Sequence, residues 1–137
     1  MPKVSGILET ALYVKDVAAS AAFYRRLFGF RVLLESDRLI ALNVAGKDVL
    51  LIFSEGTTKA SFATPGGVIP GHNGAGPTHF ALSISSDDVD PWRKRLASQA
   101  IPIESEVEWE GGAHSIYFRD PDGTLVELIT PGFWQMA

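Results

Sequence analysis

Two segments of this 137-residue chain repeat one pattern, and that repeat constrains the fold more than any other feature. Residues 9–14 (ETALYV) and 79–84 (HFALSI) share an Ala-Leu-x-Val/Ile core that is typical of a half-buried strand. An Asp-Val pair soon follows each segment, and its aspartate, Asp16 or Asp88, suits the position that caps a helix. The sequence therefore predicts two copies of one structural unit.

In each copy the first strand is followed by a helix and then by three more strands. The helices are expected at residues 17–28 and 89–98, and Gly29 suits the left-handed position just beyond the first helix. The remaining strands are expected at residues 31–35, 39–44 and 49–53, and again at 103–108, 115–119 and 125–129.

The predicted fold class is therefore α+β, with two βαβββ modules that form cupped mixed sheets within a single domain of residues 1–137. The modules are expected at about residues 6–55 and 78–131. A Gly/Pro-rich loop, at about residues 54–78, joins them and carries little predicted structure. Loops of this length in compact domains are usually functional or disordered, and this one directly precedes His79, so we expect it to border the site.

Composition excludes several function classes. The chain is 46% hydrophobic and 20% charged, as in soluble globular proteins, and its net charge of −4 with scattered basic residues argues against a nucleic-acid partner. It has no apolar run long enough to span a bilayer and no signal-peptide core, so we expect a cytoplasmic protein without a membrane partner. With no cysteine, it can form no disulfide and no thiolate.

Three polar residues interrupt apolar strands. Glu9 and His79 open the two matching strands and alternate with the side chains expected to pack on the helices, so both project from the opposite face. Glu127 lies in the middle of the apolar run 125–129 (LVELI). A carboxylate there is costly to bury unless a metal ion or an arginine compensates its charge.

Further motifs at both ends carry a family resemblance. Residues 12–16 (LYVKD) with 23–30 (FYRRLFGF) resemble the opening, and residues 117–128 (YFRDPDGTLVEL) the closing signature, of the vicinal oxygen chelate superfamily, which includes glyoxalases, bleomycin-resistance proteins and extradiol dioxygenases. With the repeat, the resemblance covers nearly the whole chain. It implies cupped sheets around one divalent metal ion, to which a small substrate binds through neighbouring oxygen atoms.

Carried over by position, the resemblance makes His79, Glu127 and Glu9 the metal ligands. The fourth ligand position of glyoxalase I falls on Leu50 or Leu51, neither of which can bind metal, so a three-ligand site remains. Glu9 replaces the histidine or glutamine of many relatives. Two carboxylates and one imidazole suit Mn²⁺, Fe²⁺, Zn²⁺ or Ni²⁺, with Mg²⁺ a further candidate, and fit oxygen activation less well than two imidazoles and one carboxylate.

Other residues have both a functional and a structural interpretation. Glu9 is equally well interpreted as a catalytic base that never contacts metal. Four side chains are candidate substrate contacts: Arg38, His72, His114 and Tyr117. The structural alternatives are a surface arginine, an exposed loop histidine, a histidine at a surface strand end and a packed tyrosine.

Three functions follow as hypotheses. The first is a metal-dependent lyase or isomerase, thiol transferase or dioxygenase that acts on a small oxygen-rich molecule. The second is a non-catalytic protein that sequesters an antibiotic, and the third is a sensor or structural relative. A homodimer is expected, with the site completed within one chain or between two. Trp109 and Trp134 are interpreted as pocket wall or dimer interface.

Overall fold

The computed structural model describes residues 1–136, and these fall into two compact units, residues 1–75 and 76–136. The first unit contains β1 (Glu9–Val14), α1 (Val17–Phe28), β2 (Arg31–Glu35), β3 (Leu39–Val44), β4 (Asp48–Ser54) and the hairpin of β5 (Phe62–Thr64) and β6 (Gly67–Ile69). The second contains β7 (His79–Ser83), the 3₁₀ turn η1 (Ser86–Asp88), α2 (Val89–Ser98), β8 (Ser105–Glu108), β9 (His114–Arg119) and β10 (Leu125–Ile129).

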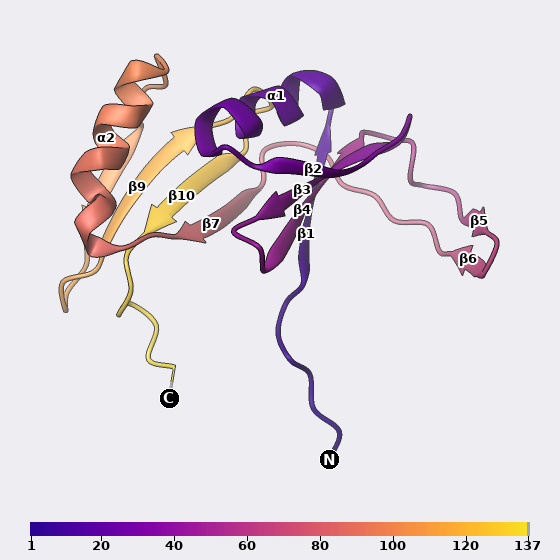
Figure 1. Ribbon diagram of the computed structural model, residues 1–137, viewed down its shortest axis with the longest axis horizontal. Coiled ribbons are helices and arrows are strands. Elements are labelled where there is room, and N and C mark those ends of the chain that lie inside the picture. Colours follow the sequence, from indigo (N-terminus) through magenta and orange to yellow (C-terminus); the bar gives the residue numbers. More distant parts are fainter. Residues whose placement is uncertain (137) are drawn as a thin grey trace. The chain divides into compact units, whose positions relative to one another are not determined.

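Each unit is built on a four-stranded mixed sheet with the same topology. The strand orders are β1-β4-β3-β2 and β7-β10-β9-β8, and in each sheet the strand that comes first in the sequence runs parallel to the one that comes last, β1 to β4 and β7 to β10 (Figure 1). The expected fold class, α+β with two mixed sheets, is confirmed. Among residues 1–136 there is no helical segment with both the length and the hydrophobicity that spanning a bilayer requires.

Helix α1 covers one face of the first sheet. Its inward residues Phe23, Tyr24 and Leu27 are buried, as predicted from their spacing. Asp16 caps its first turn by accepting a hydrogen bond from the backbone N–H of Ala19 at 3.0 Å, and Gly29 ends it at φ 74°, in the left-handed region. The cap and the glycine stop predicted from sequence are both confirmed.

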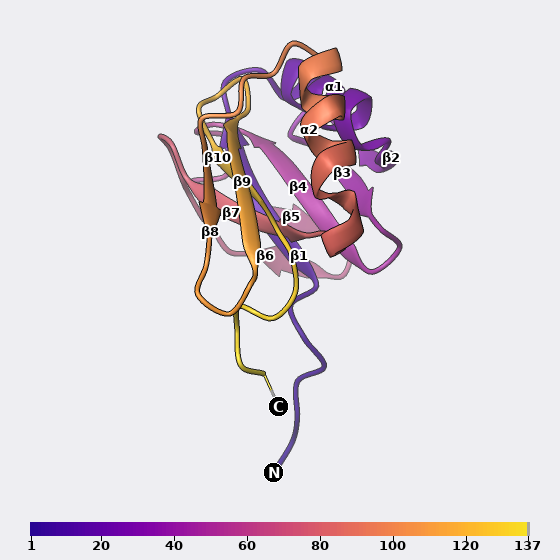
Figure 2. The same cartoon turned by 90° about the vertical axis from the view of Figure 1, so that its left-hand side faces the viewer.

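Helix α2 begins differently. The expectation that Asp88 caps it is wrong, because the Asp88 side chain makes no capping hydrogen bond. The chain instead enters the helix through η1, where the Ser85 side chain accepts from the backbone N–H of Asp87. Figure 2 shows α2 along one side of the second sheet, and Leu96 of α2 is fully buried.

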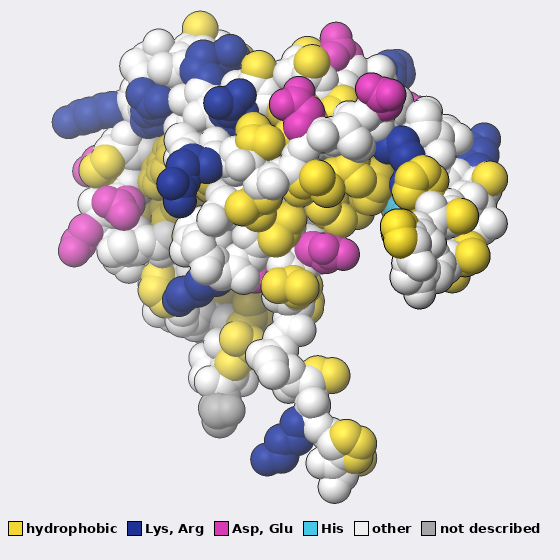
Figure 3. Space-filling view, turned by 45° about the vertical axis from the view of Figure 1, so that its right-hand side comes forward, with side chains coloured by type: hydrophobic (Ala, Val, Ile, Leu, Met, Phe, Trp, Pro, Cys, Tyr) yellow, Lys and Arg dark blue, Asp and Glu magenta, His cyan; other side chains and the backbone are white. Residues whose placement is uncertain are grey.

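The segment predicted to be an unstructured loop also departs from expectation. Residues 62–69 form the two-stranded β5–β6 hairpin, with Phe62 paired to Ile69. Phe62, Val68 and Ile69 are exposed, and hydrophobic side chains are visible on this hairpin at the right of Figure 3. The glycine- and proline-rich composition of the segment indicates turns, but it does not reveal that one of them joins two very short strands.

Candidate metal centre

Glu127 lies in the middle of the second sheet. It is 7% exposed, and its neighbours across the sheet are Ala81 on β7 and Tyr117 on β9. The turn that precedes β10 sets this register. There the Asp120 carboxylate accepts hydrogen bonds from the backbone N–H groups of Asp122 and Thr124, at 2.9 and 2.8 Å.

His79 opens β7 and faces the Glu127 carboxylate. Its Nδ1 lies 2.8 Å from the carbonyl oxygen of Leu125, and its Nε2 lies 3.2 Å from Glu127 Oε1. A carbonyl oxygen can only accept, so Nδ1 carries the hydrogen. In the neutral imidazole, Nε2 therefore turns a lone pair toward the carboxylate.

Two acceptors that face each other need a cation between them. A proton on Nε2 would serve, and so would a metal ion bound by both atoms. Metal–ligand bonds of about 2.1 Å place two ligand atoms about 3.0 Å apart at a right angle and about 3.4 Å apart at the tetrahedral angle. The observed 3.2 Å lies between these values, so His79 and Glu127 fit two adjacent positions of a divalent metal.

The second carboxylate oxygen of Glu127 is held by hydrogen bonds. Glu127 Oε2 accepts from Ser115 Oγ at 2.6 Å and from the Tyr117 hydroxyl at 3.1 Å. Burial raises the pKa of Tyr117, and the nearby Glu127 charge adds to the rise. Tyr117 therefore remains a protonated donor near neutral pH.

The two units differ at the predicted ligand positions. Glu9 is the exposed first residue of β1 and pairs with Val49, just as His79 pairs with Leu125. The residue of the first unit that corresponds to Glu127 is Leu51, because Leu51 pairs with Ala11 as Glu127 pairs with Ala81. The register thus assigns the missing fourth position to Leu51 rather than Leu50.

In neither unit do three His, Cys, Asp or Glu side chains of the described residues gather closely enough to hold a metal ion. The second unit supplies two candidate ligands, His79 and Glu127. Glu9 belongs to the first unit, and its role as third ligand or as base stays a prediction.

His72 is anchored in the first unit. Its Nδ1 lies 2.5 Å from the Tyr13 hydroxyl, and its backbone carbonyl accepts from Thr58 Oγ1 at 2.7 Å. Gly74, two residues on, packs so tightly that an added Cβ would lie 2.4 Å from the Tyr13 ring. These contacts hold residues 72–74 against the Tyr13 side chain of β1.

Arg38 and His114 also have partners within their own units. The Arg38 guanidinium lies 4.0 Å from the centre of the Phe62 ring in the hairpin. His114 Nε2 lies 2.7 Å from Glu106 Oε1, beside Arg93 of α2. Of the four predicted substrate contacts, Tyr117 is the one that touches the His79–Glu127 pair, through Glu127.

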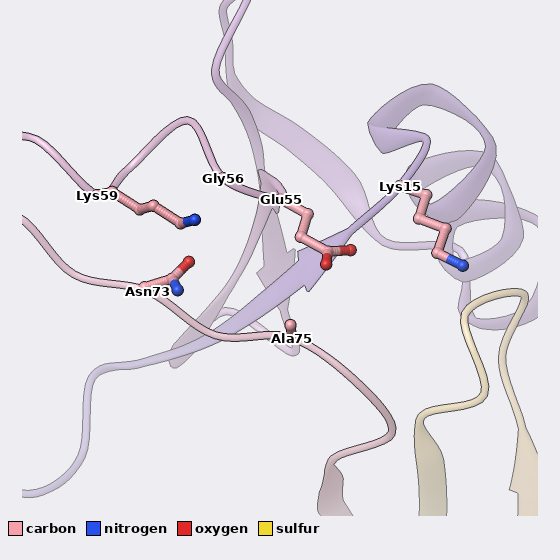
Figure 4. Close-up of a pocket in the computed structure, with 6 residues that line it drawn as sticks. All are labelled: Lys15, Glu55, Gly56, Lys59, Asn73 and Ala75. Atoms are coloured by element: carbon pink, nitrogen blue, oxygen red, sulfur yellow. The ribbon is translucent and has the colours of Figure 1, made fainter.

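The first unit holds a pocket that no sequence pattern indicated. Its volume is about 430 Å³, and Figure 4 shows the Lys59 and Asn73 side chains turned toward each other at one side of it. The lining residues are Lys15, Glu55, Gly56, Lys59, Asn73 and Ala75. Two ammonium groups and one carboxylate suit a small polar molecule better than an apolar one.

Sequence reasoning also missed Ser115, and it assigned Trp109 only to a pocket wall or dimer interface. Trp109 Nε1 donates to Ser115 Oγ at 2.8 Å, so both residues belong to the hydrogen-bond chain that reaches Glu127. A signal was present in the sequence. Ser115, Tyr117 and Glu127 share one face once the turn at residues 120–123 fixes how β9 pairs with β10.

The chain belongs to the Glyoxalase/Bleomycin resistance protein/Dioxygenase superfamily, whose family model matches residues 6–128. It is 34% identical to a solved structure of a lactoylglutathione lyase from Agrobacterium tumefaciens, with a TM-score of 0.88 over 98% of this chain and 100% of that chain. It is 29% identical to the metallothiol transferase FosB of Bacillus licheniformis over 93% of this chain and 77% of that protein.

A further relative is the catechol-2,3-dioxygenase of Bacillus subtilis, at 32% identity over 85% of this chain. The match spans only 38% of that longer protein. The relatives thus include a lyase, a thiol transferase and a dioxygenase by name, which supports an enzyme of this superfamily and does not select one reaction.

Proposed function

We propose that this protein is a divalent-metal-dependent enzyme that binds a small oxygen-rich substrate through neighbouring oxygen atoms. The proposal rests on one pair of atoms, His79 Nε2 and Glu127 Oε1, which lie 3.2 Å apart and are both of a type that binds metal. The other polar atom of each side chain, His79 Nδ1 or Glu127 Oε2, already has a hydrogen bond within the protein. The metallothiol transferase among the relatives adds support, because its name includes a metal.

A metal ion held here would act as a Lewis acid on a bound carbonyl or hydroxyl group. The protein's own residues do the rest. His79 and Glu127 would supply two ligands to the metal, and the half-exposed His79 side chain, 49% accessible, leaves the site open to a substrate. The Tyr117 hydroxyl donates its one hydrogen to Glu127, so its oxygen can accept a hydrogen bond from a molecule that reaches the site.

If Glu9 is a metal ligand, as predicted, the site favours Lewis-acid chemistry over the cleavage of a ring by oxygen. A Glu9–His79–Glu127 set would carry two carboxylates, whereas iron oxygenases typically use two histidines and one carboxylate. We therefore rank isomerisation or lyase chemistry and thiol addition above dioxygenation.

Metal content and metal affinity test the proposal. Protein purified without chelator should contain close to one equivalent of a divalent metal, and calorimetric titration of stripped protein should show one site for Mn²⁺, Zn²⁺ or Ni²⁺. Glu127→Gln should lower that affinity at least about 100-fold, because it removes an anionic ligand. Glu110→Gln, the same change at an exposed carboxylate of the same unit, should leave it unchanged.

A protein that neither contains nor binds a divalent metal would refute the proposal. Sequestration of an antibiotic would then be tested by thermal shift with cationic glycopeptides. Stabilisation by those ligands without any metal effect would support the binding-protein hypothesis.

A further inference from the structure

A hydrogen-bond chain runs from the proposed metal ligand to an aromatic cluster in the second unit. Trp109 Nε1 donates to Ser115 Oγ at 2.8 Å, and Ser115 Oγ donates to Glu127 Oε2 at 2.6 Å. Ser115 is fully buried. Burial removes water as a competing partner, so this short chain sets how the carboxylate is turned, together with the Tyr117 hydroxyl, which donates to the same oxygen at 3.1 Å.

The direction of every proton in the chain is fixed by chemistry. An indole N–H can only donate, so Ser115 Oγ must accept from Trp109. A serine hydroxyl has a single hydrogen, and that hydrogen is then committed to Glu127 Oε2. Oε2 is thereby held on the serine side of the carboxylate, which leaves Oε1 facing His79 Nε2.

Two contacts fix the position of Trp109, the first donor of this hydrogen-bond chain. Its ring lies against Phe133, with 4.5 Å between ring centres. Its backbone N–H donates to the carbonyl of Ala113 at 2.8 Å, which closes the turn between β8 and β9. The indole N–H thus has little freedom to follow a displaced serine.

The repeat within the chain supplies an internal comparison. In the first unit, Leu39 pairs with Phe53 and Ala41 with Leu51, in the register in which Ser115 pairs with Ile129 and Tyr117 with Glu127. The three polar positions of the second unit therefore correspond to three apolar residues of the first: Leu39, Ala41 and Leu51. The same strand arrangement forms without the polar set, so the fold does not require it.

Buried polar networks are rarely more stabilising than the apolar packing that could replace them. Retention of one in a single unit therefore needs a functional reason. We propose that Ser115 and Trp109 are positioning residues that aim Glu127 Oε1 at the metal, and that the Trp109 indole N–H responds to metal occupancy. This inference rests on the metal centre proposed above.

The response has a predicted direction. A metal ion on Oε1 withdraws charge from the carboxylate, so Oε2 becomes a weaker acceptor for Ser115. The serine oxygen then attracts the indole hydrogen less strongly, because hydrogen bonds in a chain polarise one another. The indole N–H proton resonance of Trp109 should therefore move upfield when Zn²⁺ binds.

Nuclear magnetic resonance of ¹⁵N-labelled protein tests this with Zn²⁺ as the probe. Trp92, Trp109 and Trp134 give three indole signals, and Trp109→Phe assigns the relevant one by its loss. Zn²⁺ should shift the Trp109 signal upfield and move the Trp92 signal much less. In metal-free protein, Glu127→Gln should shift the same signal, since it alters the end of the chain without any metal.

Calorimetry measures the positioning role itself. Ser115→Ala should weaken Zn²⁺ binding by about 10- to 100-fold, the range seen when a partner of a metal ligand is removed. Trp109→Phe keeps an aromatic ring but loses the donor, and should weaken binding less. It serves as the second variant if Ser115→Ala does not fold.

Unchanged Zn²⁺ affinity in a folded Ser115→Ala or Trp109→Phe protein would overturn the positioning role and leave the metal centre standing. Wild-type protein that binds no Zn²⁺, Mn²⁺ or Ni²⁺ would overturn both. A fall in metal-free thermal stability without a fall in affinity would assign the chain a structural role only and would also refute the inference.

Discussion

Asp16 and Asp88 occupy matching positions in the two copies, but only Asp16 caps its helix. Asp16→Ala should lower the free energy of unfolding by about 1 kcal/mol, because it leaves a backbone N–H of the first turn without its partner. Asp88→Ala should change it by less than about 0.5 kcal/mol, the usual range for surface substitutions. Urea denaturation of both variants measures the difference.

An equal loss of stability in the two variants would contradict this account. It would mean that the aspartates act through the helix dipole, to which both are similarly placed, rather than through the hydrogen bond that only Asp16 makes.

At the scale of single residues, sequence identified what depends on alternation and missed what depends on register. The inward position of Glu127 and the common face of Glu9 and Tyr13 follow from the two-residue period of a strand. The contact between Ser115 and Glu127 depends instead on pairing between β9 and β10, and the failed cap at Asp88 depends on a 3₁₀ turn started by Ser85. No sequence pattern close to these residues indicates either the Ser115–Glu127 contact or the missing cap.

At the scale of elements, charged side chains join α2 to the second sheet. Arg93 of α2 binds Glu106 of β8 at 2.8 Å, and His114 of β9 lies 2.7 Å from the same Glu106 oxygen. Asp90 also binds Arg93, and Glu108 lies 3.8 Å from His114. Glu106 is thus the common partner of a helix and a neighbouring strand.

Because Glu106 must be ionised to make these contacts, the free energy of unfolding depends on pH. The hydrogen bond from Arg93 lowers the pKa of Glu106, against the opposing effect of burial, and His114 lowers it further. Because the folded-state pKa lies below the ordinary value, the stabilisation is complete above the ordinary value and is lost as pH falls through the folded-state pKa. Glu106→Gln should cost up to about 1 kcal/mol at neutral pH.

The stability difference between wild type and Glu106→Gln should shrink as pH falls below about 4.5. Denaturation at a series of pH values measures it. Glu104→Gln is the matched control, because Glu104 pairs with Arg119 at the exposed surface and its loss should matter less. A difference that stays constant down to pH 2 would rule out the ionised Glu106 as its source.

Elements themselves were predicted unevenly, for physical reasons. Both helices have the bounds predicted from periodicity, since that signal is local, although the cap predicted at Asp88 does not form. The β5–β6 hairpin was missed because strands of three residues are too short to show alternation. The hairpin is also contacted by Arg38, whose guanidinium lies over the Phe62 ring, and no pattern within the segment predicts this tertiary contact.

At the scale of the whole molecule, the repeat predicted the fold class, because two copies of one element order allow few topologies. The motifs at both ends then carried the family resemblance, and the match of the family model confirms it. The repeat does not determine function in the same way. The second unit carries the polar set at His79, Ser115 and Glu127, whereas at the corresponding positions the first unit keeps one acidic residue, Glu9. The two candidate ligands that lie together, His79 and Glu127, therefore both belong to the second unit.

Glu9 has two predicted roles, metal ligand or base, and ligation has a consequence that a metal titration can check. Glu9→Ala should weaken Zn²⁺ binding at least about tenfold, because it removes one donor and one negative charge. Glu9→His should retain binding, since imidazole is also a ligand for these metals. Calorimetric titration compares both with Glu35→Ala, which removes an exposed carboxylate from the same unit and should have no effect.

Full Zn²⁺ affinity in Glu9→Ala would exclude ligation and leave Glu9 its alternative role as a base, visible only in turnover. If Glu9 is a ligand, mixing two defective proteins shows which chain supplies it. In a homodimer whose sites are shared, a hybrid of Glu9→Ala and Glu127→Gln chains has one intact site, because one Glu127 and one Glu9 remain to meet each other. Sites completed within single chains would stay defective in every hybrid, so recovered tight binding after mixing requires a shared site.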